Sequence, residues 1–397
     1  MRFTLSGARL VDANMDVEQG DMVIEDGHIQ AIGQSSDQPG QVIDVSDSII
    51  MPGFIEVHTH GGGGFNLHTT DVAEVHAYRH WVATTGVTSF LIAVVGTPNA
   101  LPEAQLFTAV EAIEQAKQTP QGGDAEPVGI HLEGPYISID RRGAHPPIWL
   151  RKPDPEETEL ILDLTGGYLK LITLAPELPG AHEMIKRLVE AEVTVSIGHT
   201  DTNYEEAREA IKLGITHATH CFNAMRQLKH REPGPLAAIV QAEQVMGELI
   251  ADGIHVHPAM MDMLIRMLGP QRTIVITDAQ AGAGIPDAVF EFAGQEAHVI
   301  CGAARLVDGT LTGSVLTMDQ ALRNMLEHTH VSMSEASGML SYNPARSSHI
   351  ADRKGLLQSG YDADFAIFDR SLQLQATICR GHVSFANEAW LRRLNGI

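Results

Sequence analysis

The chain has 397 residues, of which 44% are hydrophobic, and its formal net charge is −23 at pH 7. This charge argues against nucleic acid or an anionic membrane surface as a partner, because the field of the protein repels phosphate. We find no signal peptide and no run of about 18 apolar residues, so we expect no membrane span. The three scattered cysteines fit a reducing cytoplasm and argue against a disulfide framework.

The two ends of the chain have the pattern of short β-strands. Residues 23–25 and 28–30 flank Asp26-Gly27, which is the signal for a two-residue type I′ hairpin. Residues 363–368 and 373–378 are also strand-like. Neither end is large enough to form a good core alone. We therefore predict one small β-sandwich domain that both termini build, from residues 1–51 and 350–397.

The middle of the chain, residues 52–349, alternates short apolar runs with helix-like stretches. Residues 103–117 carry apolar residues at helical spacing, and Asp154-Pro155 begins a helix with a pattern like a capping box. Eight such units favour a (β/α)8 barrel, although an open doubly wound sheet is the alternative. The apolar runs are 53–57, 89–95, 128–132, 169–174, 194–197, 216–219, 247–251 and 273–277.

Side chains that can bind a metal follow five of these predicted strands. They are His58 and His60 after the first, Glu133 at the end of the third, His199 after the fifth, His220 after the sixth and Asp278 after the eighth. In a chain with 20 histidines, each histidine alone would more often be structural. A barrel brings its strand ends into one ring, so we expect the whole set to converge.

The types of these side chains indicate which chemistry they support. Imidazole and carboxylate ligands suit zinc, iron, manganese or nickel, in one or two ions. An ion with an open position activates water near neutral pH and polarises a carbonyl group. Asp278 is then the natural general base, and it can return the proton to a leaving amine. The set therefore predicts a metal-dependent amidohydrolase.

Several motifs carry a resemblance to a known family along residues 1 to about 369. The chain resembles the amidohydrolase superfamily and, within it, the N-acetylglucosamine-6-phosphate deacetylases. The motifs are PGFI at 52–55, HTHGG at 58–62, HLEGP at 131–135, LAPE at 174–177, GHT at 198–200, THCFNAM at 219–225, REPG at 231–234, ADGIH at 251–255 and LTGS at 311–314.

The resemblance implies a role for each matching residue. Glu133, His199 and His220 would hold the main metal, Asp278 would be the acid/base, and His145 would help to polarise the acetamide carbonyl. Family members with Gln-x-Asn in place of His58-Thr59-His60 hold a single metal. Both histidines here allow a second ion, which Glu133 would bridge and Asp278 would also bind.

The resemblance also implies the substrate contacts. Arg231 and His255 resemble the phosphate-binding pair, since an arginine makes strong charge-assisted contacts with anions. The residues expected to contact the sugar are Ala144, Asn223, Ala224, Leu311, Thr312 and Gly313.

The expected reaction is hydrolysis of N-acetyl-D-glucosamine 6-phosphate to glucosamine 6-phosphate and acetate, by a cytoplasmic homodimer with zinc as the leading metal. The galactosamine epimer is the nearest alternative substrate. A cyclic amide or an N-acyl amino acid is a second alternative. A barrel that has lost its metals and serves in assembly is a third, which the complete set of candidate ligands argues against.

Overall fold

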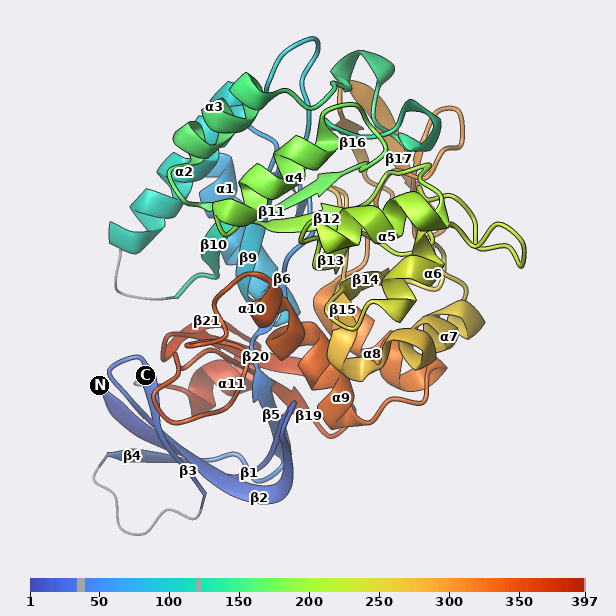
Figure 1. The fold of residues 1–397 in the computed structure, drawn as a ribbon. Helices are drawn as coiled ribbons and strands as arrows, with labels where there is room; N and C mark the ends of the chain where they lie inside the picture. The colour runs from blue at the N-terminus through green and yellow to red at the C-terminus, as the bar shows by residue number, and fades with distance from the viewer. Residues whose placement is uncertain (34–39, 119–122, 396–397) are drawn as a thin grey trace.

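The computed structural model describes residues 1–33, 40–118 and 123–395, and it has two main parts (Figure 1). A ring of strands and helices forms the larger part. A sheet built from segments near both ends of the chain forms the smaller part, at the bottom of Figure 1. None of the helices in the described residues has the length and apolar character needed to cross a membrane.

Eight parallel strands form the wall of the barrel, in the order β6-β9-β10-β11-β12-β13-β14-β15. Each strand coincides with one of the eight predicted apolar runs, to within two residues. Their bounds are β6 (Phe54–Glu56), β9 (Val87–Val94), β10 (Glu126–Glu133), β11 (Leu169–Leu174), β12 (Thr194–Ile197), β13 (His217–Ala218), β14 (Met246–Ile250) and β15 (Thr273–Ile276).

Polar contacts close the gap between the first and last strands of the wall. The backbone N–H of Asp278 donates to the carbonyl oxygen of His58 at 2.9 Å. The backbone N–H and the hydroxyl of Thr277 both donate to Glu56 Oε2, at 3.1 and 2.6 Å. Glu56 is buried, so these contacts replace water for its carboxylate. The strands therefore form a nearly closed barrel and not the open sheet considered as the alternative.

Most of the helices cover the outside of the barrel, and the last helix packs on the sheet built from both ends of the chain. The described helices are α1 (Val72–Val82), α2 (Glu103–Gln118), α3 (Pro155–Thr165), α4 (Ala181–Glu190), α5 (Tyr204–Lys212), α6 (Gly234–Gln241), α7 (Pro258–Leu268), α8 (Met318–His328), α9 (Met333–Ser337), α10 (Asn343–Ser347) and α11 (Glu388–Arg393). Helix α2 agrees with the prediction. Asp154 caps α3 as expected, but the Glu157 side chain bonds to Arg151 and Tyr136 and does not complete a capping box.

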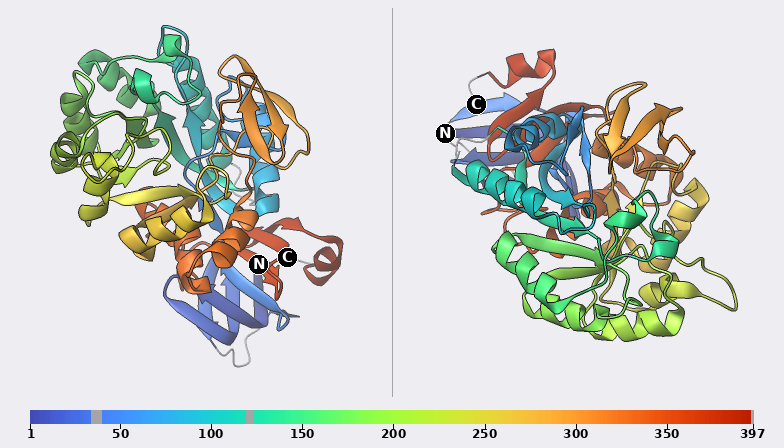
Figure 2. Two further views of the ribbon diagram at one scale, coloured as in Figure 1. Left: turned by 90° about the vertical axis from the view of Figure 1, so that its right-hand side faces the viewer. Right: turned by 90° about the horizontal axis from the view of Figure 1, so that it is seen from above.

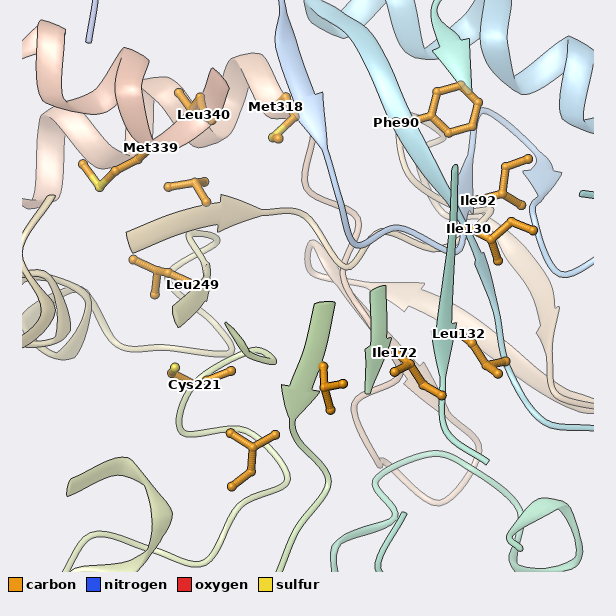
Figure 3. Close-up of a cluster of buried hydrophobic side chains, with 14 of the residues drawn as sticks. Phe90, Ile92, Ile130, Leu132, Ile172, Cys221, Leu249, Met318, Met339 and Leu340 are labelled. Atoms are coloured by element: carbon orange, nitrogen blue, oxygen red, sulfur yellow. The ribbon is translucent and has the colours of Figure 1, made fainter. Parts of the chain in front are cut away.

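Alternate residues along the strands pack into two different cores. Phe90 and Ile92 of β9 and Ile130 of β10 belong to the large cluster between the strands and the helices (Figure 3). Leu91 of β9 and Leu171 of β11 belong to a smaller cluster on the other face of the strands. This alternation follows from the two-residue period of a strand. Both faces are apolar, which is why these strands appear as continuous hydrophobic runs.

The terminal sheet joins the two ends of the chain, as predicted. Its hydrogen bonds follow the order β21-β20-β19-β5-β1-β2-β3, and β4 pairs with β1. Asp26 and Gly27 both have positive φ, +47° and +81°, which confirms the predicted type I′ turn. The boundaries after residues 51 and 349 stay predictions. The strands are β1 (Arg2–Asp12), β2 (Met15–Glu25), β3 (His28–Gly33), β4 (Gln41–Asp44), β5 (Ser48–Pro52), β19 (Phe365–Asp369), β20 (Leu374–Cys379) and β21 (His382–Ala386).

Two small sheets that the sequence did not predict lie beyond the barrel strands. β7 (Gly61–Gly62) pairs with β8 (Phe65–Asn66) directly after the first barrel strand. β16 (Val289–Phe292), β17 (Gln295–Ile300) and β18 (Ala303–Leu306) form an antiparallel sheet after the last one. We call residues 289–306 the lid sheet. It lies away from the terminal sheet in both views of Figure 2.

Candidate active site

The six predicted metal ligands lie together at the carboxyl ends of the barrel strands. All are buried, with at most 8% of each residue exposed. His199, His220 and Asp278 have φ of +46°, +26° and +49°, in the region that non-glycine residues rarely adopt. Such conformations persist where the surrounding structure holds them, and they cluster at functional sites. The predicted convergence of distant residues is therefore present.

The Glu133 carboxylate stands at the centre of five imidazoles. Oε1 lies 3.1 Å from His199 Nε2 and 3.3 Å from both His58 Nε2 and His220 Nε2, while Oε2 lies 3.2 Å from His60 Nε2 and 3.4 Å from His145 Nε2. A carboxylate offers about four acceptor sites. Hydrogen bonds to Glu133 alone therefore cannot satisfy all five nitrogens at once.

A cation fits this crowding better than hydrogen bonds do. His199 Nε2 and His220 Nε2 are 3.0 Å apart. Nitrogen ligands at 2.0–2.1 Å around a tetrahedral zinc ion are about 3.3 Å from one another. His58 Nε2 is buried and has no hydrogen-bond partner within the part of the chain that the structure describes. The residues present therefore match the needs of a divalent metal.

Two groups of side chains are compact enough to hold an ion. One group is His58, His60 and Asp278, and the other is Glu133, His145 and His199. Glu133 also contacts His58 and His60, so its carboxylate lies between the two groups. This position is the one that a bridging ligand would take.

Glu248 of β14 positions two of the predicted ligands, and it was not among the site residues predicted from the sequence. Its carboxylate lies 2.9 Å from His58 Nδ1 and 3.0 Å from His217 Nε2, and it accepts the backbone N–H of His220 at 2.9 Å. A carboxylate on Nδ1 fixes the ring and leaves Nε2 for a metal. The signal was available, because an acid inside an apolar strand is costly unless it is paired.

A cavity of about 220 Å³ opens from these ligands. Most of the residues predicted to contact substrate line it. They are Ala144, His145, Asn223, Ala224, His255, Leu311 and Gly313. Small residues such as Ala144 and Gly313, together with the larger side chains of His255 and Leu311, therefore surround the space next to the predicted ligands.

Two predicted residues do not line this cavity. Thr312 is buried behind it, and its backbone N–H bonds to Ala304. Arg231 is exposed on the loop between Met225 and α6. The structure therefore does not bring Arg231 to His255 within one chain.

Burial and neighbouring charges set the ionisation of three side chains in the cavity. Burial disfavours charge on Asp278, but its hydrogen bond with His60 and the adjacent imidazoles lower its pKa. Burial lowers the pKa of His145, which makes its ring neutral at pH 7. Burial also opposes charge on His255, but the hydrogen bond to Asp252 raises the pKa of His255. The cavity thus has a base, a neutral N–H donor and an imidazole whose protonated form is favoured.

The lid sheet supplies one wall of the cavity through Phe292. The Phe292 ring centroid is 5.6 Å from that of His60 and 5.9 Å from that of His145, with both pairs arranged edge to face. Gln295 Nε2 donates to the carbonyl oxygen of Ala144 at 2.9 Å. This hydrogen bond ties the lid sheet to the loop that carries His145.

Comparison with known proteins places this arrangement among hydrolases. The model of the amidohydrolase family matches residues 49–384. An N-acetylglucosamine-6-phosphate deacetylase of Lysinibacillus sphaericus is 36% identical over 380 residues, which cover 94% of this chain and 95% of that protein. An N-acetylgalactosamine-6-phosphate deacetylase of Escherichia coli O157:H7 is 33% identical over 386 residues, which cover 97% of this chain and 100% of that protein.

Solved structures are similar over the whole chain. A variant of the N-acetyl-D-glucosamine-6-phosphate deacetylase of Mycobacterium smegmatis, in complex with N-acetyl-D-glucosamine 6-phosphate, superposes with a TM-score of 0.88 at 31% identity and covers 97% of this chain and 99% of its own. The corresponding deacetylase of Pasteurella multocida gives a TM-score of 0.91 at 26% identity, covering 98% and 100%.

Proposed function

Because the chain belongs to the N-acetylglucosamine-6-phosphate deacetylase family of amidohydrolases, we propose that it hydrolyses the acetamide of N-acetyl-D-glucosamine 6-phosphate. The products are D-glucosamine 6-phosphate and acetate. The observation that carries the proposal is the Glu133 carboxylate among five imidazoles, with Asp278 beside it, at the wall of a cavity that also contains His255.

Members of this superfamily are metal-dependent, and the residues here suit one or two divalent ions. Glu133, His199 and His220 would hold the main ion, and His58 with His60 would hold a second. Zinc is the leading metal, with iron, manganese or nickel as alternatives, because all ligands are imidazole or carboxylate. The bound metal supplies an activated water and a polarised carbonyl group.

Asp278 carries the proton in this proposal. Its lowered pKa keeps it ionised at neutral pH, so it can accept a proton from the attacking water. Once protonated, it returns the proton to the sugar nitrogen, which leaves as an amine. His145 is neutral and can donate its ring N–H to the oxygen of the acetamide as negative charge develops there.

The substrate lies along the cavity with its phosphate at His255. The raised pKa of His255 favours its protonated form, which is suited to bind an anion on a chain that is acidic as a whole. Backbone at Ala144, Asn223 and Ala224 and in the segment 311–313 would contact the sugar. Arg231 would reach the phosphate from a second copy of the chain or after movement of its loop.

We also propose a cytoplasmic homodimer. All three cysteines are free, which suits a reducing compartment.

Release of acetate tests the proposal directly. We expect rapid release from N-acetylglucosamine 6-phosphate and very slow release from N-acetylglucosamine at the same concentration. Equal rates on the two compounds would refute the phosphate assignment.

Arg231→Ala should raise KM for the phosphorylated substrate, while Arg208→Ala, at another exposed arginine, should not. If Arg231→Ala leaves KM unchanged, the result would favour a cyclic amide or an N-acyl amino acid as the substrate.

The galactosamine epimer is the second candidate. The 33% identical relative from Escherichia coli carries that activity in its name. A ratio of kcat/KM above one for the glucosamine epimer supports the leading proposal, and the reverse ratio supports the second.

A further inference from the structure

A second cavity lies next to the active site, on the other side of Phe292. It has about 320 Å³ of space, compared with 220 Å³ in the active-site cavity. The two cavities share three lining residues, His60, Gln280 and Phe292. One of these is a candidate metal ligand, so the second cavity borders the reaction centre directly.

Phe292 separates the two cavities and is held firmly in place. It is the last residue of β16, is 7% exposed, and packs edge-on against His60 and His145. It belongs to a small apolar cluster with Ala144 and two residues of the lid sheet. Its partner in the hairpin is Gln295, which bonds to Ala144. The ring is therefore a fixed partition.

The planar shape of the substrate amide directs its acyl chain toward Phe292. The carbonyl carbon has three substituents in one plane, about 120° apart. On the proposed function, on which this inference rests, the oxygen faces His145, and the nitrogen faces Ala144 and Asn223, which are predicted to contact the sugar. The methyl group then faces the remaining wall, where His60 and Phe292 adjoin the second cavity.

The second cavity suits an uncharged chain better than an anionic one, since Glu291 also lines it. Its lining includes no lysine or arginine, so it offers no fixed cation for a carboxylate or a phosphate. His68, which lines it, is neutral because burial lowers its pKa to about 3. Val95 and Trp149 supply apolar surface, and the His68 ring lies 5.7 Å from that of Trp149.

We infer that Phe292 is the residue that limits the acyl group to acetyl, and that the cavity behind it is an unused pocket for longer straight acyl chains. Removing the ring joins the two spaces at the carbonyl carbon. The enzyme would then accept N-propionyl and N-butyryl glucosamine 6-phosphate. A pocket that rejects one methylene group reduces kcat/KM by roughly 10- to 200-fold.

The test compares kcat/KM for the N-acetyl and N-butyryl substrates in three proteins. Wild type should prefer acetyl by at least ~10-fold, the lower limit for one rejected methylene group. Phe292→Ala should raise the butyryl-to-acetyl ratio by at least ~10-fold. Phe290→Ala is the matched control, because Phe290 lies two residues earlier in β16 and lines neither cavity. Its ratio should equal that of wild type.

An unchanged ratio in Phe292→Ala would overturn the inference, as would wild-type protein that hydrolyses both substrates equally. Phe292→Leu provides the same comparison if the alanine variant does not fold. Failure of the proposed function is distinguishable, because wild type would then release no acetate from the acetyl substrate. A ratio is insensitive to a general loss of activity, so mere damage to the lid sheet does not imitate the expected result.

Discussion

The two ends of the barrel both bury carboxylates, but they compensate them in different ways. At the amino end, Glu126 begins β10 and lies 2.9 Å from Lys354 Nζ and 2.7 Å from Arg353 Nη2. Lys354 also pairs with Asp362 and Asp364 just before β19. At the carboxyl end, the basic groups that contact Glu133 among the described residues are all histidines.

This difference separates a structural cluster from a functional one. Lysine and arginine carry a permanent charge, so the amino-end network is complete without any ligand. Histidine is neutral when it binds a metal. Burial opposes charge on His58 and His60, but the neighbouring acids raise the pKa of both, so the positive charge of this network depends on protons that a bound metal would displace. A buried cluster of acids and imidazoles without a fixed cation thus indicates a place for a metal. Each of the following experiments tests one side of the comparison.

Asp278→Asn should have the largest effect. The amide cannot accept the proton, so we expect kcat to fall by at least ~100-fold while substrate still binds. Steady-state kinetics measure the change, and elemental analysis of the purified variant shows whether its metal content matches that of wild type. Retained turnover at normal metal content would exclude Asp278 as the acid/base.

Lys354→Met should affect stability and leave the reaction unchanged. Removal of this buried cation leaves the buried Asp364 without its lysine partner, while Glu126 keeps Arg353, and we expect a loss of about 3–5 kcal/mol of unfolding free energy. Urea unfolding measures the loss, with Lys212→Met at an exposed pair as the control, for which we expect no comparable loss. A folded Lys354→Met protein with reduced metal content would contradict the assignment of the amino-end cluster to stability alone.

Glu248→Gln should weaken the metal site. The amide keeps the shape of the side chain but loses the charge that orients His58, so metal affinity should fall by roughly 10- to 100-fold. Titration with a competing chelator gives the affinity. Glu209→Gln, at an exposed position on α5, is the control. Equal metal affinities in the Glu248→Gln and Glu209→Gln variants would show that Glu248 does not position His58 for metal binding.

The smallest effect concerns the pH dependence of the amino-end cluster. Burial would raise the pKa of Glu126, but Lys354 and Arg353 lower it well below the ordinary value. The depressed pKa stabilises the fold fully above the unfolded value of about 4.3, and this stabilisation decreases progressively as the pH falls from there toward the folded pKa. The difference in unfolding free energy between wild type and Glu126→Gln should therefore shrink steadily as the pH falls below about 5. A constant difference would contradict this assignment.

Patterns with a clear local cause could be predicted from the sequence, and those set by distant contacts could not. The barrel strands were predicted because both of their faces are buried, and the ligand ring because acids and histidines follow strand after strand. The Asp26-Gly27 hairpin has the residues that a type I′ turn prefers. The lid sheet turns at Ala293-Gly294 and Cys301-Gly302, where φ is also positive at both positions. Alanine and cysteine do not indicate such a turn.

The function of Glu248 and of Phe292 depends on the assembled fold. Glu248 acts on His58, which is 190 positions away. Phe292 matters because the lid sheet returns over the barrel mouth and places the ring against His60 and His145. The spacing of residues along the chain does not predict the contact of Glu248 with His58 or that of Phe292 with His60.

The pairing of β5 with β19 has a consequence for synthesis of the protein on the ribosome. Ile50 faces Ile367 across this antiparallel pair, so the terminal sheet waits for the last part of the chain to emerge. Until then, the edge of β5 has unpaired backbone groups next to apolar side chains, which is a template for aggregation. Chains that stall before residue 365 should therefore be candidates for capture by chaperones.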